Sequence, residues 1–359
     1  YGRFMTTVTY PYDEQTQSWT STSSYPNTKL KPERTKSWEV GLDARILNDI
    51  SLNLTYYRSN TYNQTFYADL SLSSGYSNIP IQSGNIMNEG LEMSLGYNKQ
   101  WKDFSFNTNY TLTWNKNRVK RLADGVYNYA TGQPIQMPEL SPLTYGHTDA
   151  RLILRVGGSM GDVYGQRLLK RDLNGYILNE EGVGLAMENK ETYLGSILPK
   201  MNMGWSLGFG YKGVNLGMTF TGRFGGIVIS ETQSVLDAAG VSKVSADVRD
   251  AGGVQINQSK VSAQTYYQTI QGTAAYYTYS ATNVRLGELS LSYTLPKKWF
   301  DNKVGMTVGL VGKNLWMIYC KAPFDPELTT SAASNFYQGF DAYMLPSTRN
   351  FGFNVKFQF

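Results

Sequence analysis

The end of the chain alternates strictly between apolar and polar residues. Residues 350–359 read NFGFNVKFQF, with one parity apolar and the other polar. Because side chains of a strand point alternately to its two faces, this segment predicts a strand with one apolar and one polar face. The apolar positions are Phe351, Phe353, Val355, Phe357 and Phe359. The fold depends on whether this apolar face meets a protein core or lipid.

The same alternation recurs along the chain and predicts eight further strands. They lie near residues 38–46, 50–58, 91–97, 104–114, 205–211, 214–224, 284–295 and 304–314. The phase of the alternation changes at Gly287–Glu288, which predicts a bulge or a bend in that strand. No segment shows a convincing amphipathic helical pattern. The sequence therefore predicts an all-β, antiparallel protein.

The two faces of these strands favour a membrane barrel. The polar parity carries many Gly, Ser, Thr and Asn residues and few charges, which is typical of a wide, hydrated lumen. The apolar parity places large aromatic residues beside turns, as Tyr97, Trp101, Tyr211, Trp299 and Phe300 do. Aromatic residues at strand ends are typical of a membrane interface. The alternative is a large soluble β-domain whose apolar face is covered by protein.

Short and long connections alternate between the predicted strands. The short ones read LND, NKQWKD, KG and PKKWFDN, and the long ones lie near 59–88, 119–200, 226–282 and 316–347. Outer-membrane barrels have short periplasmic turns and long extracellular loops. Counting back from Phe359 places every short turn on the periplasmic side. The strand-like segment RLILRV at 151–156 would break this order, so we assign it to a large extracellular excursion.

Composition excludes several other classes of protein. There is no apolar run approaching the length of a membrane helix, and only 17% of residues are charged. One cysteine and one histidine, Cys320 and His147, exclude a disulfide framework and most Cys- or His-based metal and catalytic sites. The net charge of +5 is modest and scattered, which argues against nucleic-acid binding. We expect no enzyme activity, no metal and no cofactor.

Nine strands leave two open sheet edges, which a membrane does not tolerate. An odd number also does not suit a complete bacterial barrel. We therefore expect residues 35–359 to be the C-terminal part of a larger barrel. Residues 1–34 are expected to be the end of a preceding strand and an extracellular loop.

Several stretches carry a family resemblance in the family's own order. They are LKPERTKSWEVGLDARI, RVGGSMGDVYGQRLLKRDLNGYI, NVRLGELSLSYTLPKKW, VGLVGKNLWMIY, KAPFDPE and LPSTRNFGFNVKFQF. Together, from about residue 29 to 359, they resemble the SusC/RagA family of TonB-dependent outer-membrane transporters. The terminal strand ending in Phe359 also resembles the signal that the barrel-assembly machinery reads.

The resemblance implies a plugged barrel of about 22 strands in the bacterial outer membrane. It implies import of oligomers powered through TonB by the inner-membrane proton gradient, with a SusD-like surface lipoprotein as a lid. SusC-like proteins commonly import oligosaccharides, which we favour as the substrate, and RagA-like proteins import oligopeptides. A passive, porin-like barrel is the alternative.

Binding residues are expected in the long loops, since the strands are committed to lipid and lumen. Tyrosine and phenylalanine offer rigid faces that can pack on sugars or on peptide side chains. The candidates are Tyr266, Tyr267, Tyr276, Tyr277, Tyr279, Phe336, Tyr337, Phe340 and Tyr343. The alternative is that these residues pack the loops against each other or against the lid.

Other chemistry-bearing residues receive simpler interpretations. Asp325 and Glu327 in APFDPE could bind a cation or a basic substrate group, but the flanking prolines favour a rigid turn with solvated carboxylates. The segment RDLNGYI lacks the ligand series of a calcium loop, so Asn174–Gly175 is interpreted as a hairpin turn. His147 is interpreted as a loop residue and Cys320 as a packed thiol.

Overall fold

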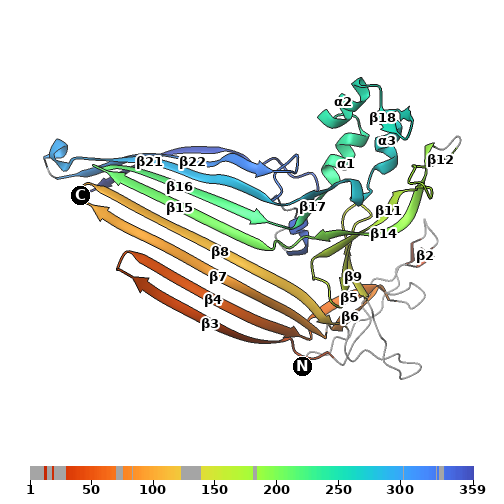
Figure 1. Ribbon diagram of the computed structural model, residues 1–359, viewed down its shortest axis with the longest axis horizontal. Helices are drawn as coiled ribbons and strands as arrows, with labels where there is room; N and C mark the ends of the chain where they lie inside the picture. Colours follow the sequence, from red (N-terminus) through yellow and green to blue (C-terminus); the bar gives the residue numbers. More distant parts are fainter. Residues whose placement is uncertain are drawn as a thin grey trace.

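A curved antiparallel sheet of nine strands dominates the computed structural model (Figure 1). The structure describes residues 12–13, 18–19, 30–69, 76–82, 84–122, 139–180, 184–301, 303–328, 330 and 335–359. The sheet follows the order β24-β22-β21-β16-β15-β8-β7-β4-β3. The strands are β3 (Arg34–Ile46), β4 (Ile50–Tyr62), β7 (Asn85–Trp101), β8 (Phe104–Arg121), β15 (Met201–Tyr211), β16 (Val214–Phe224), β21 (Asn283–Leu295), β22 (Gly305–Cys320) and β24 (Asn350–Gln358). All nine predicted strands are confirmed, and β3, β4, β7, β8, β15 and β22 extend further than predicted.

Tight turns join the strands at the end of the sheet where the C-terminus lies (Figure 1). Between β15 and β16 the turn residues Lys212 and Gly213 have φ of 45° and 89°, the left-handed pair that a two-residue hairpin turn requires. Leu47 and Asn48 between β3 and β4 have φ of 49° and 60°. Between β21 and β22 lies a short 3-10 helix, η3 (Lys297–Phe300). The prediction that the short connections lie together at one end of the sheet is confirmed, and their periplasmic location stays a prediction.

Strand β21 contains the predicted bulge. Its pairing with β16 passes from Thr219↔Glu288 directly to Phe220↔Leu286, so Gly287 has no partner. The extra residue moves the apolar positions from one parity to the other while they stay on one face of the sheet. Leu289 and Leu286 therefore lie on the same face despite their odd and even numbers.

The apolar side chains of this sheet are exposed. Leu310 and Phe353 are 64% and 79% exposed, and many other large apolar residues of the strands share this state. They include Trp38, Val40, Leu42, Leu95, Trp205, Leu291, Phe351, Val355 and Phe357. We call this side of the sheet the outer face and the polar side the inner face. Among the described residues, the buried clusters draw on these strands only through Ile86 and Val119, near the ends away from the tight turns.

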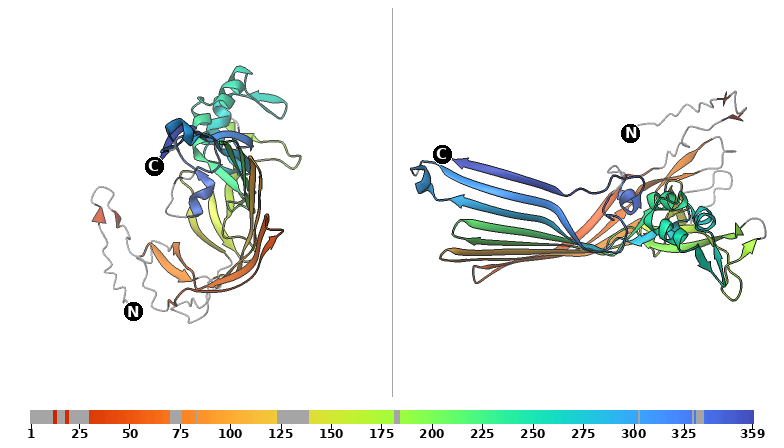
Figure 2. Two further views of the ribbon diagram at one scale, coloured as in Figure 1. Left: turned by 90° about the vertical axis from the view of Figure 1, so that its left-hand side faces the viewer. Right: turned by 90° about the horizontal axis from the view of Figure 1, so that it is seen from above.

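The long connections fold together at the other end of the sheet, and we call this part the mouth assembly (Figures 1 and 2). It contains a four-stranded sheet in the order β14-β11-β10-β9 and a three-stranded sheet in the order β20-β17-β23. Its strands are β5 (Thr65–Asp69), β6 (Asn78–Gln82), β9 (Glu139–Thr144), β10 (Arg151–Arg155), β11 (Asp162–Leu169), β12 (Asn179–Glu180), β13 (Gly184–Leu185), β14 (Met187–Ser196), β17 (Ile227–Ser230), β18 (Val254–Ile256), β19 (Ser259–Val261), β20 (Thr278–Ser280) and β23 (Phe340–Asp341). The segment RLILRV forms β10 outside the nine-stranded sheet, as predicted. Residues 1–34 lie mostly outside the described residues, apart from β1 (Tyr12–Asp13), β2 (Ser18–Trp19) and residues 30–34, which lead into β3.

The mouth assembly also contains short helices, which the sequence interpretation did not identify, while the prediction of an all-β fold holds for the chain. They are α1 (Glu231–Ala238), α2 (Lys243–Asp250), α3 (Ala263–Ile270), and the 3-10 segments η2 (Ala274–Tyr276) and η4 (Asn335–Gly339). Ser230, Ser242 and Ser262 cap the three α-helices, each accepting a backbone N–H three residues later. Two turns of helix are too short to show a periodic pattern in the sequence. No helix among the described residues is long and apolar enough to cross a membrane.

Candidate functional site

The mouth assembly lies partly on the concave side of the nine-stranded sheet, where η4 and β23 are found (Figure 2). Its central core is built around Tyr145, which is fully buried. The Tyr145 hydroxyl donates to the Phe336 carbonyl at 2.7 Å, and its ring contacts Tyr337 and Phe340 at 6.1 and 5.2 Å. Burial raises the pKa of Tyr145. One tyrosine thus joins the connection before β10 to the last connection of the chain.

The predicted tyrosine-rich segment forms a second core with α3. Tyr267 and Tyr277 are 7% and 2% exposed and lie inside it. Tyr266, Tyr276 and Tyr279 are partly buried at its edge, and the Tyr276 hydroxyl accepts a hydrogen bond from the Leu169 backbone N–H at 3.1 Å. Burial, with the charge of Asp237, raises the pKa of Tyr279 to about 12. Packing therefore accounts for Tyr267 and Tyr277.

The aromatic residues of the last connection likewise differ in how deeply they are buried. Phe340 is 3% exposed in the central core, and Phe336 and Tyr337 pack against that core while partly buried. Tyr343 is 60% exposed, and its hydroxyl donates to the Glu231 carboxylate at 3.3 Å. Tyr343 is thus the exposed member of this group.

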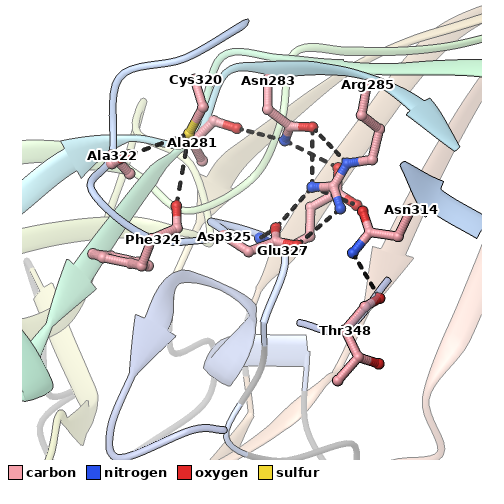
Figure 3. A network of polar contacts seen from close by, with 10 residues as sticks. All are labelled: Ala281, Asn283, Arg285, Asn314, Cys320, Ala322, Phe324, Asp325, Glu327 and Thr348. Atoms are coloured by element: carbon pink, nitrogen blue, oxygen red, sulfur yellow. Dashed lines mark hydrogen bonds and ion pairs between the residues drawn. The ribbon is translucent and has the colours of Figure 1, made fainter. Parts of the chain in front are cut away.

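A buried polar network ties the last connection to the inner face of the sheet, and we call it the latch (Figure 3). The Arg285 guanidinium on β21 donates to both carboxylate oxygens of Asp325, at 2.9 and 2.7 Å. Arg285 also donates twice to the Asn283 side-chain oxygen at 3.2 Å. Asn283 in turn donates to Glu327 at 3.0 Å, and Glu327 lies 3.5 Å from Arg285. The latch comprises these four residues.

The prediction of solvated carboxylates is wrong for Asp325. The side chains of Arg285 and Asp325 are only 11% and 8% exposed. Burial alone would raise the pKa of Asp325, but the hydrogen bonds and charge of Arg285 hold that pKa below its ordinary range. A bidentate arginine already occupies this carboxylate, which leaves no acid free for a cation. The residues APFDPE therefore anchor a loop.

Two further contacts hold the same segment (Figure 3). The Asn314 side chain on β22 donates to the Thr348 carbonyl at 3.2 Å. The Cys320 thiol, partly buried, lies 3.4 and 3.7 Å from the Ala322 and Phe324 carbonyls. These contacts agree with the prediction of a packed thiol. The path of the chain from β22 towards η4 is thus fixed at several points.

The inner face of the sheet is lined mainly by small, uncharged groups. A cavity of about 560 Å³ near the tight turns is bordered by residues such as Ser51, Gly96, Asn107 and Asn109. A Cβ at Gly208 would lie 2.5 Å from the Asn107 side chain, so glycine is needed where these neighbours approach. Such a surface can hydrogen-bond to hydroxyl and amide groups. Its charged lining residues are Arg45 and Asp49, and Asp49 forms an ion pair with Lys99.

No metal-binding cluster is found among the described residues. They contain no group of three or more His, Cys, Asp and Glu residues that could hold a metal ion. Asn174 and Gly175 form a turn closed by Asp172, whose carboxylate accepts the N–H groups of Asn174 and Tyr176 at 2.9 and 2.8 Å. The interpretation of this segment as a hairpin turn is confirmed. His147 is exposed in a loop, as predicted.

The sequence interpretation missed the residues that hold the mouth together. Asp149 accepts backbone N–H groups from Gln166, Arg167 and Ala274, and its side chain is 7% exposed. Asp149 and Arg285 were both missed, and Arg285 was the easier of them to recognise in the sequence. It is a charged residue between Val284 and Leu286 at an inward position of a strand, and it needs a charged partner because the last connection buries it.

Comparisons with known proteins agree with this architecture. Residues 1–315 match the family model described as TonB dependent receptor-like, beta-barrel. TonB-dependent receptor P3 of Formosa agariphila is 26% identical over 93% of this chain and 35% of its own length. TonB-dependent receptor SusC of Bacteroides thetaiotaomicron is 28% identical over 119 residues, 32% of this chain and 12% of its own length. The chain thus spans about a third of the length of the first of these relatives.

Solved structures show the same fold. The RagAB peptide importer in its closed-closed state aligns with 99% of this chain and 38% of its own, at a TM-score of 0.67 and 18% identity. The open-open state aligns over the same shares at a TM-score of 0.65 and 19% identity. The nine-stranded sheet therefore has the curvature and connectivity of one part of a larger transmembrane barrel.

Proposed function

Because this chain belongs to the family of TonB-dependent receptor-like β-barrels of the bacterial outer membrane, we propose that it forms the wall and mouth of an active nutrient importer. The observation that carries the proposal is the contrast between the faces of the sheet. Its outer face exposes large apolar residues such as Leu310 and Phe353, while the inner face is polar and partly covered by the mouth assembly. A passage with a structured mouth suits a large substrate.

Energy and a lid belong to the same proposal. Import would draw on the proton gradient through TonB, since the family is named for that dependence. A SusD-like surface lipoprotein would cover the mouth assembly. The likeness to SusC and to the RagAB fold supports such a pairing.

We propose oligosaccharides as the substrate. An inner wall rich in Asn, Ser, Thr and Gly matches a neutral, hydroxyl-bearing ligand better than a charged one. Contact residues would be the accessible aromatic side chains of the mouth: Tyr266, Tyr276, Tyr279, Phe336, Tyr337 and Tyr343. Oligopeptides are the second candidate, because the RagAB complex of the same fold is described as a peptide importer.

Uptake by intact cells tests this function. Cells with and without the gene are given fluorescently labelled oligosaccharides or labelled oligopeptides of matched size. The proposal expects gene-dependent uptake of the oligosaccharides that stops when an uncoupler collapses the proton gradient. Gene-dependent uptake of peptides alone would replace the proposed substrate.

A passive pore is distinguished in the same assay. A porin-like barrel would admit small solutes with the uncoupler present and would have no size preference for oligomers. Uncoupler-resistant uptake would therefore overturn active import. Co-purification of a surface lipoprotein with the detergent-extracted protein tests the lid separately.

A further inference from the structure

Strand β8 carries a row of cations on its outer face where it leaves the apolar region. Lys116, Arg118 and Lys120 are exposed, while Val119 between them is fully buried on the inner side. Trp114, two residues before Lys116, is an exposed member of the outer face. The three cations therefore continue the outer face beyond its last aromatic residue.

The strand register extends this row across the neighbouring strands. Lys116 pairs with Glu89, Glu89 with Arg58, and Arg58 with Trp38. The next outward positions on β3 are Lys36 and Arg34, both exposed. We call the set of outward cations on β3, β4 and β8 the basic rim. It consists of Arg34, Lys36, Arg58, Lys116, Arg118 and Lys120.

The basic rim lies at the level where lipid gives way to water. Trp38 and Tyr56 form a ring pair at 5.5 Å on the outer face, and Trp114 lies on the same face of β8. Aromatic residues in such positions mark the membrane interface. The cations begin one residue pair beyond Tyr56 and Trp114, at the end of the sheet opposite the tight turns. This is the depth of the outer-leaflet headgroups.

Little on the protein neutralises the basic rim. Lys116 lies 3.9 Å from Glu89, and this is the only ion pair the rim makes among the described residues. Arg58, Arg118 and Lys120 have no carboxylate within ion-pair distance in that part of the chain.

If the cations of the basic rim were ordinary solvated residues of a membrane interface, similar cations would be expected around the whole sheet. The other half of the sheet differs. At the same end, the outward positions of β15, β16, β21 and β22 carry Met201, Met203, Phe220, Phe224, Val284, Leu286, Trp316 and Ile318, with no lysine or arginine. The positive charge is therefore concentrated on one sector, with Arg349 before the edge strand β24 as the exception.

A cavity adjoins this sector. It has a volume of about 490 Å³ and is lined by Lys116, Arg118 and Lys200 together with Asp162 and Tyr193. The Asp162 carboxylate already accepts the Ser159 N–H at 2.8 Å and the Tyr193 hydroxyl at 3.2 Å. The cavity thus presents three cations against one carboxylate whose hydrogen bonds are made within the protein.

We propose that the basic rim and this cavity bind the phosphate groups of anionic lipid in the outer leaflet. Arginine binds phosphate oxygens in a bidentate manner, and lysine adds a point charge. Each cation near an anionic membrane surface adds to the attraction, and the apolar outer face below holds the acyl chains. The proposal rests on the outer-membrane location of the family and is independent of what the protein imports.

The test measures lipid retained by the protein. The wild-type protein and a triple variant, Arg58→Gln, Arg118→Gln and Lys120→Gln, are placed in phosphatidylcholine nanodiscs that contain a phosphorylated lipid A. Bound lipid is then counted by native mass spectrometry. We expect about a tenfold loss of bound phosphorylated lipid in the variant. The control variant removes three cations at the opposite end: Lys297→Gln, Lys298→Gln and Lys303→Gln. It should retain as much lipid as the wild type.

Three outcomes would overturn the proposal. One is equal retention by the triple variant and the wild type, and another is equal retention of a lipid A stripped of its phosphate. The third is displacement of the lipid by inorganic phosphate at concentrations that leave the wild-type fold intact, which would indicate a site for the free anion. A heat-modifiable gel band confirms that each variant is folded. If the triple variant does not assemble, Arg118→Gln alone carries the test.

Discussion

Two leucines illustrate the contrast between the nine-stranded sheet, which we call the wall, and the mouth assembly. Leu310 on β22 is 64% exposed on the outer face, whereas Leu154 on β10 is completely buried in the mouth assembly. The same side chain is thus used against lipid in one region and against protein in the other. The wall faces lipid and the mouth assembly faces water, so different interactions stabilise the two regions.

The wall depends on its hydrogen-bond ladders. Strands β8 and β15 pair without interruption from Phe104↔Tyr211 to Trp114↔Met201. In lipid every unpaired backbone group is costly, so regular pairing is a requirement there. The mouth instead has short strands, short helices and three hydrophobic cores. Packing and buried polar contacts stabilise it in water.

The largest effect is expected from breaking the latch. Replacing Arg285 by Ala leaves Asp325 buried without its cation, which should destabilise the mouth by about 3–5 kcal/mol. The measurement is the rate of proteolysis within residues 321–349 in detergent. Lys313→Ala is the control, since Lys313 on β22 makes an exposed ion pair at 3.6 Å with Glu288 on β21, the strand that carries Arg285. Equal rates for both variants would show that the latch does not hold the loop.

The two leucines themselves give the next test. Leu154→Ala should cost about 2–5 kcal/mol because it leaves a cavity in a packed core. Leu310→Ala should have much less effect on the stability measured in detergent, since its side chain packs on no protein core. Thermal unfolding of the detergent-solubilised variants measures both. A larger loss for Leu310→Ala would reverse the assignment of the two environments.

Charge on the outer face should interfere with assembly. Leu310→Arg places a cation on the apolar outer face and should cost about 2–4 kcal/mol. Thr307→Arg, on the inner face of the same strand, should be tolerated because that face is hydrated. The fraction of protein with a heat-modifiable gel band reports assembly. The account fails if the two substitutions have the same effect.

The smallest effect is expected from pH. The pKa of Asp325 is below its ordinary value in the folded state, so the stability it contributes is present above the unfolded pKa, about 3.9, and is lost as pH falls through the folded pKa. Proteolysis of residues 321–349 should therefore be constant from about pH 8 to pH 5 and should increase only below about pH 4. Asp325→Asn should abolish this dependence. An increase near pH 6 would indicate another titrating group.

The wall could be predicted from the sequence because each strand has its own alternating pattern. Alternation defines the faces, and the alternating loop lengths define the order of the strands. Even the bulge at Gly287 is visible as a change of phase. These signals are local in sequence, and a two-residue period survives over ten residues or more.

The mouth could be predicted only in part, because its contacts join distant segments. Arg285 and Asp325 are 40 residues apart, and Tyr145 meets Phe336 across 191 residues. No local pattern carries such pairs. The helices had a usable signal, since Ser230, Ser242 and Ser262 each stand at an N-cap, but eight residues give too few repeats to confirm it. The tyrosines were correctly placed in a loop region, but burial of Tyr267 and Tyr277 depended on α3.

Accessibility of matched spin labels tests the orientation of the sheet most directly. Labels are attached to cysteines introduced at Leu310 and Thr307 in a Cys320→Ser background, in lipid bilayers. The label at 310 should be relaxed by oxygen, which concentrates in lipid, and the label at 307 by a water-soluble nickel complex. Equal access of the nickel complex to both positions would contradict the claim that the apolar face of this sheet meets lipid.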